Sequence, residues 1–168
     1  MTVALCDTSL LNHDFDEVAA FQAFQQAHAT SGAIASFAGR VRPYDAASGL
    51  KIDALYLDWY PGMSEQSLDR IAKDAMARFA PNGLLIIHRC GLVKAGEVIV
   101  LVCAASDHRR AALEAVDNVM DRLKSEAVLW KREIGCTADG QAIDRWVEPT
   151  NKDHLDLARW SKKEKSHG

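Results

Sequence analysis

The sequence lacks an excess of positive charge, a paired-cysteine motif and any apolar run long enough to cross a membrane. Its formal net charge is -3 and its pI is near 6.0, whereas nucleic-acid-binding domains usually gather basic residues on one face, so we expect no nucleic-acid partner. No apolar run reaches the roughly 18 residues that span a bilayer, and the N-terminus carries no basic signal region. These absences predict a cytoplasmic protein that does not enter a membrane.

Motifs of several common enzyme classes are also missing. The sequence contains no G-x-G-x-x-G, no Walker-type phosphate loop, no H-E-x-x-H and no G-x-S-x-G, which removes many nucleotide-binding, metalloprotease and hydrolase families. The four cysteines form no C-x-x-C pair, and the six histidines show no metal-ligand spacing with cysteine or carboxylate. We therefore expect reduced cysteines, no bound metal and no resident cofactor.

The chain is long and apolar enough for one globular core. A length of 168 residues with 48% hydrophobic content predicts a single domain, which we assign to residues 1–150. Residues 151–168 are then a C-terminal tail, in which HLDLARW predicts a short helix and the polar end SKKEKSHG predicts disorder.

Hydrophobic periodicity predicts alternating helices and strands. Helices are predicted over 14–29, from Ser64 to the break at Pro81, and as a long main helix that begins after Ser106 as its N-cap. Strands are predicted over 32–41, 51–60 and 128–134, and the runs LLIIHRCG and GEVIVLVCAAS are predicted to pair as a hairpin. Mainly antiparallel strands interrupted by helices are typical of an α+β domain.

Cationic side chains gather at the ends of these elements. A helix start already presents unpaired N–H groups and a positive dipole, so the pair His108-Arg109 at the start of the main helix points to an anionic ligand. Arginine binds phosphate or carboxylate with two parallel hydrogen bonds, and a lysine with a lowered pKa can act as a nucleophile or carry a proton. The cations that such a pocket would gather are Arg40, Arg42, His108, Arg109, Lys124 and Lys131.

Simpler interpretations of the same residues remain open. Lys124 also fits a solvated helix face, and Arg40 with Arg42 also fits surface ion pairing. Alternation along 128–134 places Lys131 and Glu133 on one face of a strand and Trp130 and Arg132 on the other. On that pattern Lys131 with Arg132 also fits an ordinary edge-strand charge pair, and Arg145 fits a structural role.

Four segments together resemble the large, catalytic subunit of molybdopterin synthase, over Gly32 to Glu148. They are GAIASFAGRVR, YPGM, HRCGLVKAGEVIVLV and SDHRRAALEAVDNVMDRLKSEAVLWKRE. The strand end G-R-V-R, the H-R pair, D-x-L-K and W-K-[KR]-E follow in that family's order and spacing. Two positions depart from the pattern, because Val128 stands where the family commonly has proline and Asp58-Trp59 stands where Glu-His or a similar acidic pair is usual.

The resemblance implies a fold, an activity and partners. The family has an α/β-hammerhead arrangement with a long helix after the central hairpin, and it converts cyclic pyranopterin monophosphate into molybdopterin in molybdenum cofactor biosynthesis. Sulfur comes from the C-terminal thiocarboxylate of a small ubiquitin-like sulfur-carrier subunit, and two such subunits join a central homodimer in a heterotetramer. Clustered cations would offset the charge of the phosphate and of the anionic tail.

The resemblance also implies roles for individual residues. Lys124 and Lys131 are expected to be catalytic, with Lys124 at the thiocarboxylate end and Lys131 orienting the pterin and moving protons. Arg145 matches an arginine that acts across the dimer interface. The residues expected to bind substrate are Arg40, Val41, Arg42, His108, Arg109, Lys124, Lys131, Arg132, Glu133 and Arg145.

Two other functions would use the same cations. A noncatalytic regulatory module would hold a nucleotide or a phosphoprotein, and Lys124→Ala would only weaken its binding. A phosphate-ester hydrolase would use His108 with a carboxylate such as Asp107, although no metal site or activated nucleophile supports it.

Overall fold

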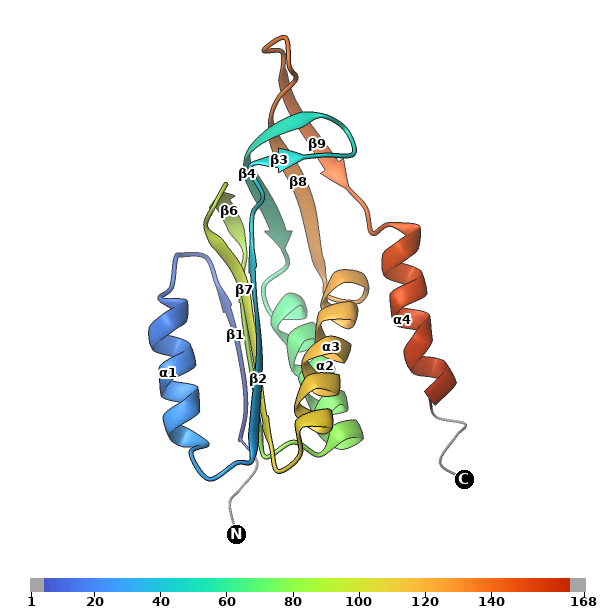
Figure 1. Ribbon diagram of the computed structural model, residues 1–168. Coiled ribbons are helices and arrows are strands. Elements are labelled where there is room, and N and C mark those ends of the chain that lie inside the picture. Colours follow the sequence, from blue (N-terminus) through green and yellow to red (C-terminus); the bar gives the residue numbers. More distant parts are fainter. Residues whose placement is uncertain (1–4, 164–168) are drawn as a thin grey trace.

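The computed structural model describes residues 5–163, which form helices and strands in alternation (Figure 1). In chain order the elements are β1 (Leu5–Leu11), α1 (Glu17–Ala27), β2 (Ala33–Arg40), β3 (Tyr44–Asp45), β4 (Leu50–Trp59), α2 (Met63–Phe79), β5 (Gly83–Arg89), β6 (Gly91–Lys94), β7 (Val98–Ser106), α3 (Arg109–Ser125), β8 (Leu129–Cys136), β9 (Ala142–Val147) and α4 (Asn151–Lys163).

The strands form two sheets. The first has the order β1-β5-β7-β2, and the second has the order β3-β4-β8-β9 with β6 also paired to β4. The β1–β5 pair is parallel, whereas the other described pairs are antiparallel. The predicted α+β class with mainly antiparallel strands is therefore confirmed, as is the long helix α3 after the β5–β7 pair.

The first sheet carries helices on both faces (Figure 1). Helices α2 and α3 pack on one face, where Ile71 and Val119 meet Ile86 and Val102 of the strands. Helix α1 packs on the other face, where Phe24 meets Leu85, Leu101 and Cys103. Residues of opposite parity along β5 and β7 thus enter two separate cores, as expected for a strand buried on both sides.

The predicted hairpin is correct, but its connection is more than a turn. Strand β5 pairs with β7 as expected, while four residues of the connection form β6 and pair with β4. This strand ties the first sheet to the second. Strands β1, β3 and β9 were not predicted, because each is short or polar and depends on a partner strand rather than on its own hydrophobic alternation.

The main helix begins two residues later than the sequence predicts. Ser106 is the last residue of β7, and His108 is the N-cap, with an extended backbone and no hydrogen bond from its side chain to the helix. The continuous buried run of β7 extends through Ala104 and Ala105 to Ser106, which pairs with Ala33, so strand pairing takes the residue expected to cap the helix.

The predicted helix of the C-terminal tail exists and is docked. Trp160 of α4 is buried beside Phe79 of α2, and Arg159 donates to the Asp121 carboxylate of α3 at 2.6 Å. Disorder was predicted for residues 161–168, but residues 161–163 continue α4, and residues 164–168 lie outside the described part of the chain. Within residues 5–163, no helix is both long enough and apolar enough to cross a bilayer.

Candidate active site

Lys124 and Lys131 line one pocket although they belong to different elements. Lys124 lies in the last turn of α3, where the negative end of the helix dipole favours a cation. Lys131 lies on β8, seven residues further along the chain. The pocket has a volume of about 150 Å³, and its other walls are Leu129, Val147, Glu148, Pro149, Thr150 and Asp153.

The two lysines have different surroundings. The side chain of Lys124 is 53% exposed, so it reaches solvent at the edge of the pocket. Burial lowers the pKa of Lys131, the positive charge of Lys124 lowers it further, and the charge of Asp153 opposes both effects. Lys131 is therefore easier to deprotonate than an ordinary lysine, which suits a group that exchanges a proton.

Asp153 is the acidic partner of the pair. Its Oδ1 lies 3.4 Å from Lys124 Nζ, and its Oδ2 accepts hydrogen bonds of 2.8 Å from both the backbone N–H and the hydroxyl of Thr150. Burial raises the pKa of Asp153, but these hydrogen bonds and the charge of Lys124 outweigh burial and lower it overall. Asp153 is therefore a stable carboxylate in the pocket.

A second small pocket, of about 110 Å³, adjoins the same face of β8. It is lined by Arg40, Val41 and Arg42 together with Glu133, which lies two residues from Lys131 and so points to the same side of the strand. Across the β8–β9 ladder, Arg145 donates to Glu133 at 2.8 Å and lies 3.4 Å from Asp45. The structure therefore places Arg40 to Arg42, Glu133 and Arg145 beside the lysine pocket.

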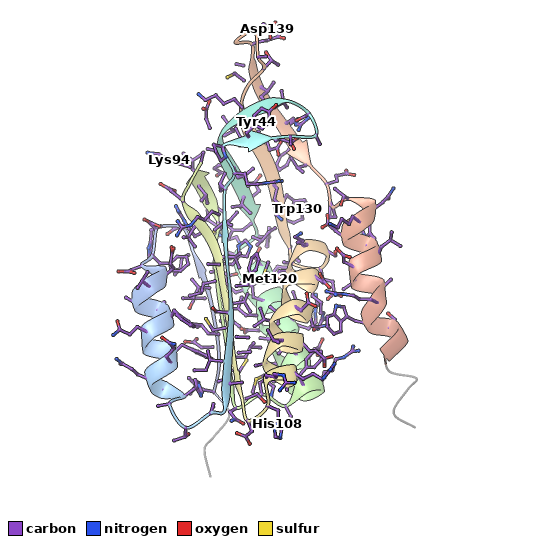
Figure 2. The ribbon with its side chains drawn as sticks, in the orientation of Figure 1. Tyr44, Lys94, His108, Met120, Trp130 and Asp139 are labelled. Carbon is purple, nitrogen blue, oxygen red and sulfur yellow. The ribbon has the colours of Figure 1, made fainter. Side chains whose placement is uncertain are left out.

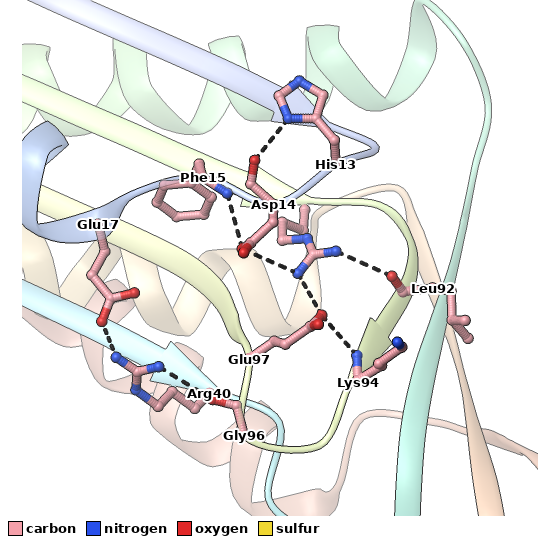
Figure 3. A network of polar contacts seen from close by, with 10 residues as sticks. His13, Asp14, Phe15, Glu17, Arg40, Leu92, Lys94, Gly96 and Glu97 are labelled. Atoms are coloured by element: carbon pink, nitrogen blue, oxygen red, sulfur yellow. Dashed lines mark hydrogen bonds and ion pairs between the residues drawn. The ribbon is translucent and has the colours of Figure 1, made fainter.

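Arg40 is bound within its own chain (Figure 3). Its guanidinium pairs with Glu17 of α1 and donates to the carbonyl of Gly96 at 3.2 Å. In the neighbouring network Arg89 pairs with Glu97 at 2.8 Å, which fixes the loop that carries Gly96. This network holds the end of β2, and with it Val41 and Arg42, against the second sheet.

His108 and Arg109 are not brought to the lysines within one chain. They occupy the opposite end of α3, about 24 Å from Lys124 at 1.5 Å per residue, and Figure 2 shows His108 far from Trp130 at the start of β8. Both side chains are exposed. The expectation that all the cations converge is therefore wrong for a single copy of the chain.

Arg132 lies on the other face of β8, as the alternation predicts. Its guanidinium stacks between Tyr56 and Trp146, at 5.1 and 5.6 Å from the ring centroids, and lies 3.2 Å from Asp144. A position there cannot contact a ligand held by Lys131. Of the residues expected to bind substrate, Arg132 is thus the one that the strand turns away from the pocket.

The acidic, C-terminal part of the pocket was not predicted from the sequence. Thr150 and Asp153 have the spacing of a helix-capping pair, a signal that predicts the start of α4 but not its position against Lys124. His88, a buried histidine on β5, was not singled out either. Burial lowers the pKa of His88 to about 4 with help from the charge of Lys131, although a hydrogen bond to the Arg89 carbonyl raises it, so the ring is neutral.

A larger hollow of about 590 Å³ lies between α2, α3 and α4. Its lining includes Arg78, which donates to the Trp160 carbonyl at 2.6 Å, and Arg122, which is already paired with Asp74 at 2.9 Å and with Glu126 at 2.7 Å. Because these two carboxylates offset the charge of Arg122, this hollow suits an anionic substrate less well than the lysine pocket does.

An α+β domain with two lysines of unlike surroundings in a small pocket suits a transfer enzyme for anionic substrates, and comparisons with known proteins agree. The MoaE protein family matches residues 11–126. The molybdopterin synthase catalytic subunit of Brucella melitensis is 43% identical over 158 residues, which cover 94% of this chain and 93% of that protein.

Solved structures give the same result. The molybdopterin biosynthesis MoaE protein from Burkholderia ambifaria has a TM-score of 0.72 and 35% identity, covering 94% of this chain and 98% of that one. A complex of subunits 1 and 2 of molybdopterin-converting factor from Helicobacter pylori shares the fold, with a TM-score of 0.63 and 21% identity over 82% of this chain and 88% of that chain.

The chain belongs to the MoaE protein family. Its function is that of the catalytic subunit of molybdopterin synthase, an enzyme of molybdenum cofactor biosynthesis.

Proposed function

We propose that the chain transfers sulfur from the terminal thiocarboxylate of a small ubiquitin-like subunit to cyclic pyranopterin monophosphate, in the pocket of Lys124 and Lys131. The observation that carries the proposal is the juxtaposition of these lysines, one exposed and one with a lowered pKa. A pocket with two ammonium groups attracts an anionic tail, and the unlike surroundings allow one lysine to bind charge while the other exchanges a proton.

The chemistry divides between the two lysines. The thiocarboxylate sulfur bonds to a substrate carbon, and a carbon–oxygen bond at that carbon breaks, so the oxygen leaves as phosphate oxygen or water. Water then attacks the partner's acyl carbon, the bond between this carbon and the sulfur breaks, and the partner leaves as a carboxylate. If the amine of Lys124 attacks instead, the partner stays attached to Lys124 through an amide until water hydrolyses that bond. Lys124 stabilises the developing oxyanion, and Lys131 moves the proton that each sulfur addition requires.

The pocket of Arg40, Val41 and Arg42 is the proposed site for the phosphate and the pterin. It lies beside Lys131 along β8, with Glu133 between the two pockets. Arginine guanidinium groups bind phosphate with two parallel hydrogen bonds. To bind it, Arg40 must exchange its contact with Glu17 for the substrate.

His108 and Arg109 require a second copy in this proposal. They lie at the far end of α3 and are exposed, so they reach a lysine pocket only if they belong to a neighbouring chain. We therefore propose a central homodimer with composite pockets, with one small subunit at each distal end and with the family's hammerhead arrangement in each copy. The Helicobacter pylori relative is itself a complex of subunits 1 and 2, which supports the binding of a small subunit.

The test is reconstitution with purified components. The chain, a thiocarboxylated small subunit and cyclic pyranopterin monophosphate are mixed without ATP, and molybdopterin is measured as its fluorescent oxidation product. We expect product with the thiocarboxylate and none with the same partner ending in a carboxylate. Binding of both components without product would instead favour the noncatalytic anion-binding module.

A further inference from the structure

The lysine pocket already contains an anion of its own. Asp153 Oδ1 lies 3.4 Å from Lys124 Nζ, and the Asp153 side chain is only 17% exposed. Asp153 is also one of the residues that line the pocket. This carboxylate thus occupies the type of position that the anionic tail of a partner would need beside Lys124.

Asp153 is held in place from two directions. Its Oδ2 accepts both hydrogen bonds from Thr150, which leaves Oδ1 to face Lys124. The far end of α4 is anchored separately, because Trp160 is buried and its indole N–H donates to Asp121 at 2.7 Å. The attachment of α4 through Trp160 therefore does not depend on the contact between Asp153 and Lys124.

The titratable groups of the lysine pair and its surroundings come from five parts of the chain. Lys124 belongs to α3 and Lys131 to β8, while Glu148 lies on the segment between β9 and α4 and Asp153 on α4. Behind Lys131, His88 of β5 is buried. Asp153 is the only one of these groups in an ion pair with Lys124 within the described residues, so its removal changes the charge balance most directly.

We propose, on the basis of the proposed function, that Asp153 is a positioning residue: it is the resting counterion of the lysine pair, and the terminal anionic group of the partner takes its place. A second carboxyl-type anion beside Lys124 in a pocket of about 150 Å³ is repelled by Asp153, so the two anions compete for the lysine. Entry of the tail displaces Asp153, and departure of the tail lets it return.

The first test measures the lysines directly and needs no turnover. In protein labelled with ¹³C at the lysine Cε carbons, NMR titration follows the protonation of Lys131 against pH. In Asp153→Asn the Lys131 titration is expected to move to lower pH, because the negative charge that opposes its deprotonation is gone. Asp156→Asn removes an equal charge from the same helix and is expected to leave it unchanged. Equal titrations in wild type and Asp153→Asn would overturn the proposal.

The second test measures competition with the partner. The small subunit ending in a carboxylate is titrated into each variant by calorimetry, and Asp153→Asn is expected to bind it roughly twofold to fivefold more tightly, the range for one partly exposed ion pair. The gain should vanish when the partner's terminus is amidated. A purely structural Asp153 would give weaker binding in Asp153→Asn, and that result, or unchanged binding, overturns the proposal.

Two further variants keep the tests decisive. Asp153→Glu retains the charge and is expected to behave like wild type, whereas Thr150→Val retains the carboxylate but loses one of its hydrogen bonds and is expected to fall between the two. If the wild-type chain does not bind the small subunit, the proposed function fails, while the NMR titration still decides whether Asp153 controls the lysines.

Discussion

The two ends of α3 carry cations under opposite conditions. At its C-terminal end Lys124 meets a favourable helix dipole, a facing lysine and a carboxylate within one pocket. At its N-terminal end His108 and Arg109 meet the unfavourable end of the dipole, are exposed, and have no acidic residue in the first turn. The first end has a complete arrangement of charges, whereas the second has no acidic residue in the first turn of the helix. In the proposed assembly, substrate or a second copy completes the N-terminal end.

The largest expected effect is at the C-terminal end of α3. Lys124→Ala should lower turnover by roughly 10²–10⁴-fold, the usual range for losing a group that acts in the transition state, while partner docking persists on other surfaces. Lys124→Arg should not restore turnover, because a guanidinium keeps the charge but cannot reproduce the ammonium position or deprotonate readily. Steady-state turnover with Lys73→Ala as the exposed-lysine control measures this. Near wild-type turnover in Lys124→Arg would show that Lys124 contributes only its positive charge.

A smaller effect is expected at the N-terminal end of α3. Arg109→Ala should weaken substrate binding by about 1.5–3 kcal/mol, the value of a lost charge-assisted contact, and high substrate concentration should recover part of the rate. Arg110→Ala is the matched control, because Arg110 is the next residue and its side chain is 85% exposed beside Glu114. Equal losses in the two variants would show that Arg109 contributes only general charge.

Mixing variants tests whether the two ends meet across a dimer. When Lys124→Ala and Arg109→Ala chains are combined and allowed to exchange, each mixed dimer contains one pocket with both defects and one intact pocket. Random pairing should restore about one quarter of the wild-type sites. Activity no higher than the average of the separate variants would place both residues in pockets built from one chain, and a strictly monomeric chain in light scattering would agree with that outcome.

The backbone of Val128, between α3 and β8, should have a measurable effect on stability. The N–H of Val128 donates to the Ser67 hydroxyl at 3.1 Å, and its carbonyl accepts from the Ser64 hydroxyl at 2.7 Å. Ser67→Ala should therefore lower the free energy of unfolding by about 1 kcal/mol. In a Val128→Pro background, which lacks this N–H, the same substitution should cost less. Urea unfolding of the four proteins gives the coupling, and strictly additive losses would contradict it.

The smallest expected effect concerns Lys131. The pKa of Lys131 is lowered in the folded state. Between this lowered pKa and the ordinary lysine value, the unfolded chain therefore binds more protons than the folded chain. The contribution of Lys131 to stability thus rises with pH over this window. Lys131→Met, which removes the buried ammonium, should stabilise the fold at neutral pH by up to about 1 kcal/mol. Its advantage should shrink as the pH rises through the window. Melting temperatures across that range test the sign.

Local pattern predicted the elements that carry their own signal. The apolar period of α3 and the alternation of β8 each depend on a few neighbouring residues, and both place Lys124, Lys131 and Arg132 on their correct elements and faces. The start of α3 was predicted two residues early, because strand pairing through Ser106 competed with capping. Strands β1, β3 and β9 were missed because each is short or polar, and among them only β1 has a partner, β5, that lies far away in the sequence.

The sequence by itself determined the α+β class, the family and the presence of cations at element ends, because periodicity and motif spacing are local properties of the chain. Only the tertiary structure decided which charges share a pocket. The crossing of α3 and β8 brings Lys131 to Lys124, the docking of Trp160 brings Asp153 to both, and the length of α3 keeps His108 and Arg109 away. These distances follow from the packing of whole elements, and they cannot be obtained from the spacing of residues along the chain.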